Sequence, residues 1–185
     1  MQGIMSVLNK TRAAETVSTL DIESSNRAVA DVWLSLWTAD ALPARDKLTP
    51  FNFKAFLPSI IVFDVVPNTS VTVRLAGTRF APILGAELTG IDWLASAPDG
   101  YRAERLRIFS TIAEGAIGVG HRRTEMSLGG DIVSEEILLP FTPCCAGAPS
   151  QVLTHINWKS EHFLQVKSVE QAAGGPLDFK IVALR

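Results

Sequence analysis

The stretch "IIVFDVVPNTSVTVRLAGTRFAPILGAELTG", residues 60–90, decides the fold. Two runs rich in β-branched residues flank a Pro-Asn-Thr-Ser turn, which is typical of a β-hairpin. The second run ends at Gly77, and one or two short helical turns follow, with Gly85 as their stop and a polar turn at Gly90. We interpret all three glycines as residues that serve backbone turns.

The hairpin register can be predicted from the two apolar sides. They consist of Ile61, Phe63 and Val65 in the first run and of Val71, Val73 and Leu75 in the second. If these sides coincide, Asp64 lies directly opposite Arg74 on the other face of the hairpin. Opposite charges across a strand pair are favourable, so we predict this pairing.

A helix is predicted upstream of the hairpin, capped by Ser24, Ser25 or Asn26. Its apolar residues recur at helical spacing, at Val29, Val32, Trp33, Leu36 and Trp37. Two interpretations of this stripe remain open. It packs on the protein's own sheet, or it also packs against a second copy, with Val29, Trp33 and Trp37 as candidate interface residues.

The segments beside this helix are less regular. Residues 1–22 are polar and weakly patterned, and we expect a tail or a loosely docked segment. Three prolines follow the helix, so we expect a loop that leads to a short helix with Pro50 in its first turn and Pro58 at its end.

Downstream, residues 101–115 predict a longer helix with Leu106, Phe109 and Ile112 or Ala113 on its inner side and Gly115 as its stop. Three strands are expected over residues 117–128, 132–141 and 151–159, with "SLGGDIV" as the turn between the first two. This order of elements predicts an α+β domain in which an antiparallel sheet has its helices mainly on one side.

Composition limits the possible functions. The chain has 185 residues, of which 47% are hydrophobic and 19% charged, and its formal net charge is -2. One domain with a sizeable core is expected. Neither sign of charge forms a block, which argues against a nucleic-acid partner. The sequence shows no signal peptide and no membrane-spanning stretch, so we expect a cytoplasmic protein without a membrane partner.

The chain resembles the PAS domains, and more closely a family of small PAS-like proteins of alphaproteobacteria that was first described as a domain of unknown function. The resemblance rests on "VADVWLSLW", "LPARDKLTPFNFKAFLPSIIVFDVV", "VTVRLAGTRFAPILGAELTG" and "EEILLPF". It implies a five-stranded antiparallel sheet covered by helices on one face, with an N-terminal amphipathic helix. The corresponding division is a tail at 1–22, a PAS-like domain at 23–162 and an extension at 163–185.

The resemblance implies sensing or protein interaction, and the fold alone does not choose a ligand. Flavin photochemistry would need a reactive cysteine after the hairpin, and "RFAPILGAE" has none. Haem would need an axial ligand, and we interpret His121, His155 and His162 as surface or strand-face residues. Glu135 and Glu136 alternate to opposite faces of their strand, which argues against joint metal binding. The cofactor, if there is one, stays unidentified.

An enzymatic function is not expected. The sequence has no Gly-x-Ser-x-Gly elbow and no phosphate-binding loop that ends in Lys-Ser/Thr, and "GGD" at Gly129 to Asp131 is interpreted as a turn. The adjacent Cys144 and Cys145 are interpreted as reduced bystanders in a loop, with a redox role as the alternative.

Two functions from different classes remain. In the first, a sensor binds a small apolar or amphipathic molecule and signals through a separate, unidentified protein. Its candidate ligand-binding residues are Arg79, Phe80, Leu84, Trp93, Phe109 and Met126. In the second, the same residues fill the core, and the domain is a ligand-free dimerisation or docking module. A homodimer is expected under both.

The C-terminal end departs from the family pattern. "VEQAAGGPLDFKIVALR" passes a Gly-Gly-Pro break into a segment in which Phe179, Ile181 and Ala183 alternate with Lys180, Val182 and Leu184. This alternation predicts an edge strand or a segment that docks on a neighbouring copy, with disorder as the other possibility.

Overall fold

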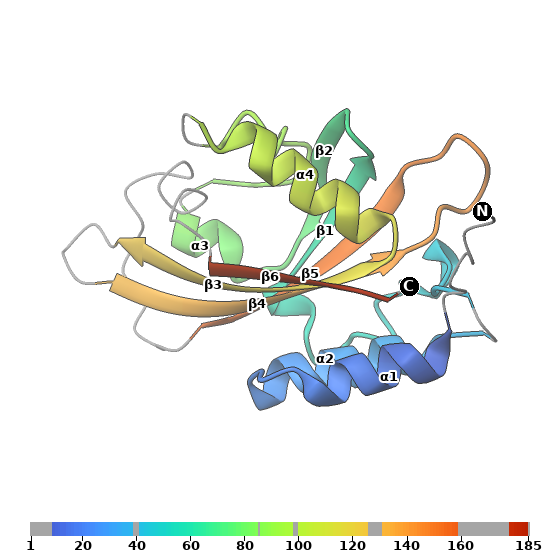
Figure 1. Cartoon of the computed structure of the whole chain (residues 1–185). Coiled ribbons are helices and arrows are strands. Elements are labelled where there is room, and N and C mark those ends of the chain that lie inside the picture. The colour runs from blue at the N-terminus through green and yellow to red at the C-terminus, as the bar shows by residue number, and fades with distance from the viewer. Residues whose placement is uncertain are drawn as a thin grey trace.

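A fully antiparallel sheet forms the centre of the computed structural model, which describes residues 9–38, 41–84, 86–97, 100–125, 131–158 and 178–184. Within these residues, six strands lie in the order β2-β1-β5-β4-β3-β6 (Figure 1). Their bounds are β1 Ile60–Val66, β2 Ser70–Ala76, β3 Ala116–Glu125, β4 Asp131–Phe141, β5 Ser150–Trp158 and β6 Asp178–Ala183. The sheet therefore has one strand more than expected, and that strand is β6.

Helices cover both faces of the sheet, which corrects the expectation that they lie mainly on one face. The helices are α1 Lys10–Thr19, α2 Ser24–Ser35, α3 Phe80–Leu84 and α4 Arg102–Ala113. Figure 1 shows α4 on one side of the sheet and the α1–α2 pair on the opposite side. We call these the α4 face and the α2 face. Each face has its own buried hydrophobic cluster.

The hairpin is confirmed, but its register differs from the prediction. Asp64 pairs with Thr72, not with Arg74, because the hairpin closes with Val66 opposite Ser70 and this register continues unbroken to Phe63. Arg74 still reaches the Asp64 carboxylate diagonally, with Nη1 and Oδ2 3.5 Å apart. Farther from the turn, a register shift between Val62 and Phe63 places Leu75 opposite Val62. This shift removes Leu75 from the apolar side of β2, and Leu75 is 45% exposed.

Close backbone packing explains Gly77. A Cβ atom there would overlap the carbonyl oxygens of Leu57 and Pro58, so no larger residue fits. Gly90 has a φ of 86°, a conformation that favours glycine because it has no Cβ. Gly85 lies outside the described residues, so its predicted role as a helix stop stays a prediction.

Residues 9–22 of the N-terminal segment, which was expected to be a tail or loosely docked, include helix α1 and pack on the rest of the domain. In α1, Ala13 and Val17 are buried against the α2 face. The start of α2 also differs from the prediction, because Glu23 occupies the N-cap position and no side chain caps the helix. Asn26 is instead buried and bonds to the sheet.

The proline-rich loop does not contain the expected short helix. Residues 50–56 form turns, between two 3-10 helices, η1 at Arg45–Lys47 and η2 at Leu57–Ser59. Pro58 lies in the first turn of η2, where its missing N–H costs no hydrogen bond.

The downstream elements follow the prediction closely. The inner side of α4 buries Ile108, Phe109 and Ile112, and Gly115, with a φ of 111°, follows the helix. The expected turn at 127–130 lies outside the described residues. The C-terminal segment forms edge strand β6, which pairs with β3 and places Phe179 and Ile181 against the α4-face cluster.

Candidate functional site

Four buried polar side chains lie on the α4 face of the three central strands. Arg122 of β3 and Ser134 of β4 are directly opposed, and Glu136 lies two residues beyond Ser134 on the same face. Thr154 of β5 is opposite Leu138, which belongs to the α4-face cluster. All four are at most 8% exposed. Because residues at spacing two share a face, strand geometry alone gathers this set.

An ion pair occupies the centre of this polar set. Arg122 Nε lies 2.8 Å from Glu136 Oε1, and the two side chains are 9% and 5% exposed. Removing both charges from water costs several kcal/mol per ion, which their attraction offsets only with good geometry. A buried pair of this kind is therefore weak evidence for stability and a reason to look for a binding role.

Two hydroxyls beside the ion pair have no hydrogen-bond partner among the described residues. They are Ser134 Oγ and Thr154 Oγ1, both fully buried. An unsatisfied buried hydroxyl costs about 1–3 kcal/mol, so native structures rarely keep one without a reason. A bound molecule that accepts or donates at these oxygens would remove that cost.

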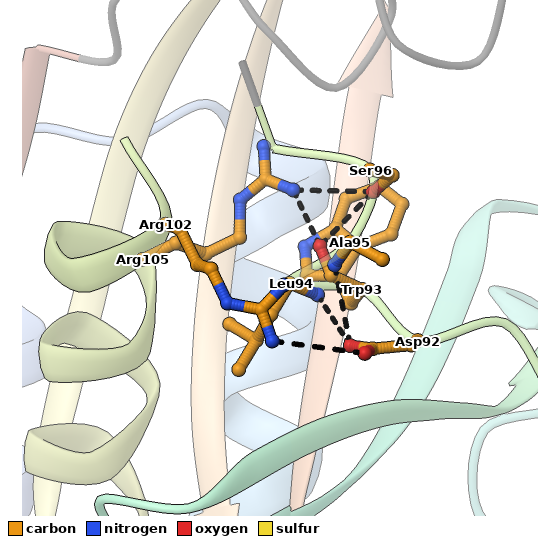
Figure 2. Close-up of polar contacts among 7 residues, drawn as sticks. All are labelled: Asp92, Trp93, Leu94, Ala95, Ser96, Arg102 and Arg105. Carbon is orange, nitrogen blue, oxygen red and sulfur yellow. Dashed lines mark hydrogen bonds and ion pairs between the residues drawn. The ribbon is translucent and has the colours of Figure 1, made fainter. Parts of the chain in front are cut away.

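Arg105 brings a second guanidinium from α4 to this face. Its Nη1 donates to Trp93 O at 2.6 Å and to Ser96 Oγ at 3.2 Å, and its Cζ lies 4.9 Å from the centre of the Trp93 ring (Figure 2). Burial lowers the pKa of Arg105 to about 10; the nearby charge of Arg122 also lowers it, whereas Glu136 raises it. Arg105 thus stays a cation at neutral pH, within electrostatic reach of the ion pair.

The segment that Arg105 contacts is fixed at both ends. Asp92 Oδ1 accepts from the backbone N–H groups of Leu94 and Ala95, and its Oδ2 lies 3.9 Å from Arg102 Nη2 (Figure 2). Trp93 N donates to Val71 O of the edge strand β2. The segment therefore joins the β2 edge to α4.

Aromatic rings form the apolar part of the α4 face. Phe63 contacts Phe109 at 4.7 Å and Trp93 at 5.4 Å between ring centroids. Phe80 contacts Trp158 at 6.4 Å. The predicted ligand-binding residues Phe80, Trp93 and Phe109 thus share one buried cluster.

Among the other predicted ligand-binding residues, Arg79 has a described side chain, and it is not part of that cluster. Arg79 Nη1 donates to Ser59 Oγ, and its charge acts on His155 of the α2 face, so it is directed away from Phe80. The side chain of Leu84 and all of Met126 lie outside the described residues. The predicted interface residues Val29, Trp33 and Trp37 are at most 5% exposed and pack on the protein's own sheet.

The sequence reading missed the polar residues of this site, although a signal existed. In "DIVSEEILLPF" the alternation of β4 places Ser134 and Glu136 on the same face as Leu138. The alternation of Glu135 and Glu136 to opposite faces was predicted correctly. No sequence pattern predicted that Arg105 belongs to this site, because its position on the helix was equally consistent with a solvent-exposed side chain.

The α2 face holds a second buried polar group. Glu135 Oε1 accepts from Asn26 Nδ2 at 2.7 Å and from Glu23 N at 2.8 Å, while its Oε2 lies 3.3 Å from His121 Nε2. His155 Nδ1 lies 2.6 Å from Asn26 Oδ1. Burial and, to a smaller extent, the charge of Arg79 together lower the pKa of His155 to about 4. A neutral His155 therefore donates its Nδ1–H to Asn26 at neutral pH.

The protein should become less stable as the pH falls, because His155 is buried in its neutral form. As the pH drops from about 6.5 to about 4, the unfolded chain protonates His155 and the folded chain does not. The free energy of unfolding should then fall by up to about 1.4 kcal/mol per pH unit. Urea unfolding across this pH range, compared between the unaltered chain and His155→Asn, tests this prediction. Asparagine keeps an N–H donor and cannot titrate. The variant should lose this part of the slope, and an unchanged slope would contradict the prediction.

No metal site is evident in the described part of the chain, where no three His, Cys, Asp or Glu side chains gather. Nor does any described helix have the length and apolar character needed to cross a membrane.

Comparison with known proteins identifies one family. A family model described as PAS domain matches residues 22–156. No curated protein matches. A solved structure titled "Structure of an RNA-binding Light-Oxygen-Voltage Receptor" is similar at a TM-score of 0.40 and 18% identity, over 80% of this chain and 47% of that one. This chain therefore spans about half the length of that receptor chain.

Proposed function

This chain belongs to the PAS domain family, and from that premise we propose that it is a sensory domain which binds a small amphipathic molecule on its α4 face. The observation that carries the proposal is the pair of unpartnered buried hydroxyls, Ser134 Oγ and Thr154 Oγ1. They lie on the same face as the Arg122–Glu136 ion pair and the aromatic cluster. Polar and apolar binding groups thus meet on one side of the sheet.

The ligand's chemistry follows from the groups on this face. A polar head with hydrogen-bonding oxygens suits the two hydroxyls and the guanidinium of Arg122. An apolar body suits the rings of Phe80, Trp93 and Phe109. Catalysis is not part of the proposal, because the site offers no nucleophile paired with a base. The signal would pass to a separate partner protein.

Native mass spectrometry of the purified chain tests binding directly. We expect a non-covalent adduct that is absent from the denatured mass, and an absorbance spectrum of the same sample shows whether the adduct is coloured. A chain with no adduct, before and after incubation with a metabolite extract, would count against the sensor function and leave the ligand-free dimerisation module.

The hydroxyls give a sharper test, because their removal should change stability and binding in opposite directions. Thr154→Val keeps the shape and removes an unsatisfied group, so it should raise the free energy of unfolding of the ligand-free chain by about 1 kcal/mol. The same change should weaken ligand retention by roughly tenfold. Ser25→Ala is the matched control, since Ser25 Oγ is also buried and unpartnered but belongs to α2. A Thr154→Val chain with lower stability and unchanged retention would refute the proposal.

A further inference from the structure

Two adjacent cysteines form an exposed thiol pair in the loop between β4 and β5. Cys144 Sγ and Cys145 Sγ lie 3.6 Å apart, and both side chains are exposed. Arg45 Nη1 lies 3.7 Å from Cys144 Sγ. The direct contact with Arg45 is made by Cys144, and this asymmetry distinguishes the two sulfurs.

The backbone holds Arg45 beside this loop. Ala44 pairs with Thr142 as a parallel bridge, Arg45 N donates to Thr142 O, and Thr142 N donates to Pro43 O. These contacts join the segment before η1 to the residues just after β4. The guanidinium of Arg45 is thus held near Cys144 by the fold, although ninety-nine residues separate the two in sequence.

Cys144 opens onto a surface groove of about 560 Å³. Cys144 and Arg45 line it together with Arg74 and Gln151. The groove gives a small molecule access to the Cys144 sulfur. It lies apart from the proposed ligand site, because its lining residue Val62 belongs to the α2-face cluster.

The environment assigns different roles to the two sulfurs. The hydrogen bond from Cys145 and the contact with Arg45 lower the pKa of Cys144. The pKa of Cys145 is raised by its bond to Cys144. Cys144 is therefore the sulfur that ionises more readily, and the thiolate is the nucleophilic form of cysteine. Cys145 keeps its proton to higher pH.

We propose that Cys144 and Cys145 form a redox-sensitive site in which Cys144 is oxidised by a hydroperoxide and Cys145 then closes a reversible disulfide. In the first step the Cys144 sulfur attacks the peroxide oxygen, the O–O bond breaks, and the departing alkoxide or hydroxide takes up a proton. In the second step the Cys145 sulfur attacks the resulting sulfenic acid, an S–S bond forms and water leaves. Two thiols and one hydroperoxide thus give one disulfide, one alcohol or water, and one water.

Adjacency makes this disulfide easy to reduce. Consecutive Cα atoms across a trans peptide are about 3.8 Å apart, below the range of about 4.4–6.8 Å found for most disulfides. Strained disulfides have more oxidising potentials and serve as labile, regulatory bonds. The site would therefore return to the dithiol when a cellular thiol reductant is restored.

The experiment uses the reduced full chain, treated with hydrogen peroxide or cumene hydroperoxide and followed by intact mass. The chain contains only these two cysteines, so Cys144→Ser and Cys145→Ser each leave a single thiol. We expect the unaltered chain to lose two hydrogens, remain monomeric in covalent mass and return to its starting mass with dithiothreitol. Cys145→Ser keeps a hydroxyl donor to Cys144 and should accumulate a sulfenic acid that dimedone captures.

Two comparisons decide the assignment of roles. Cys144→Ser should react several-fold more slowly than Cys145→Ser, and Arg45→Gln should slow disulfide formation about threefold or more. Lys47→Gln, which removes a neighbouring cation of η1, is the control and should leave the rate unchanged. Equal rates for the two single-cysteine chains, or disulfides between chains only, would overturn the proposal. None of these outcomes depends on the proposed ligand.

Discussion

Replacing Glu136 with leucine should lower the free energy of unfolding by about 3–5 kcal/mol, because it leaves the Arg122 charge buried without its carboxylate. The two groups are 2.8 Å apart and almost inaccessible to water. Leucine cannot supply the negative charge that faces the guanidinium. Urea unfolding of the purified chain at neutral pH measures the change.

A double variant separates the loss of the carboxylate from the change in shape. Arg122→Met with Glu136→Leu removes both charges and keeps similar volumes, so much of the lost stability should return. A coupling free energy near zero between the two changes would show that the ion pair contributes nothing, which would contradict the prediction. Because the pair also lies in the proposed ligand site, both measurements are made on ligand-free protein.

The recovery of stability in the double variant would bear on function as well. If an apolar pair serves the fold as well as the ion pair does, the charges are not kept for stability. Loss of ligand retention in that stable double variant would then show that binding is what requires them. A stable variant that keeps its ligand would instead move the binding site away from Arg122 and Glu136.

Local patterns predicted the elements that depend on neighbouring residues. The hairpin with its Pro-Asn-Thr-Ser turn, helix α4 and the three following strands were predicted from spacing and turn residues. The PAS fold itself was predicted from the family resemblance. The resemblance to PAS domains rested on the same stretches. The C-terminal alternation also predicted the edge strand β6.

Features that depend on contacts between residues far apart in the sequence could not be predicted from local patterns. The pairing of Val66 with Ser70 across the turn has no unique signature in the sequence, so Asp64 was placed opposite the wrong residue. The further register shift between Val62 and Phe63 has no signature either. Helix α1 has a mostly polar sequence and buries little more than Ala13 and Val17, and its packing depends on α2. No local pattern could show that Asn26 bonds to Glu135, because 109 residues separate them.

Of the candidate site, the aromatic residues were predicted from the sequence and the polar residues were not. Its aromatic residues were identified because large apolar side chains are buried in most domains, whatever their function. Its polar residues were missed because charged residues lie in solvent in most domains and were expected to do so here. Glu136 illustrates a pattern that identifies such residues. A charged residue on the inward face of a strand that is otherwise apolar is a candidate binding residue.

Replacing Trp33 with alanine should cost about 3–5 kcal/mol of stability, as expected for the loss of a fully buried large aromatic residue. The indole also donates from Nε1 to Pro140 O at 2.9 Å and meets the Trp37 ring edge-to-face at 5.3 Å. Helix α2 is thereby tied to strand β4. Chemical unfolding measures the loss, and a change below about 1 kcal/mol would contradict this packing.

Phenylalanine at the two tryptophans gives the matched comparison. Trp37 Nε1 is buried and has no hydrogen-bond partner among the described residues, whereas Trp33 Nε1 has one. Trp33→Phe should therefore cost more than Trp37→Phe, by about 1 kcal/mol for the lost hydrogen bond. Any dependence of the unfolding midpoint on protein concentration should also be the same in Trp33→Phe as in the unaltered chain, because both rings pack within one chain. A midpoint that rises with concentration and loses this dependence in Trp33→Phe would place the tryptophans at an interface between copies, which was the alternative that the sequence left open.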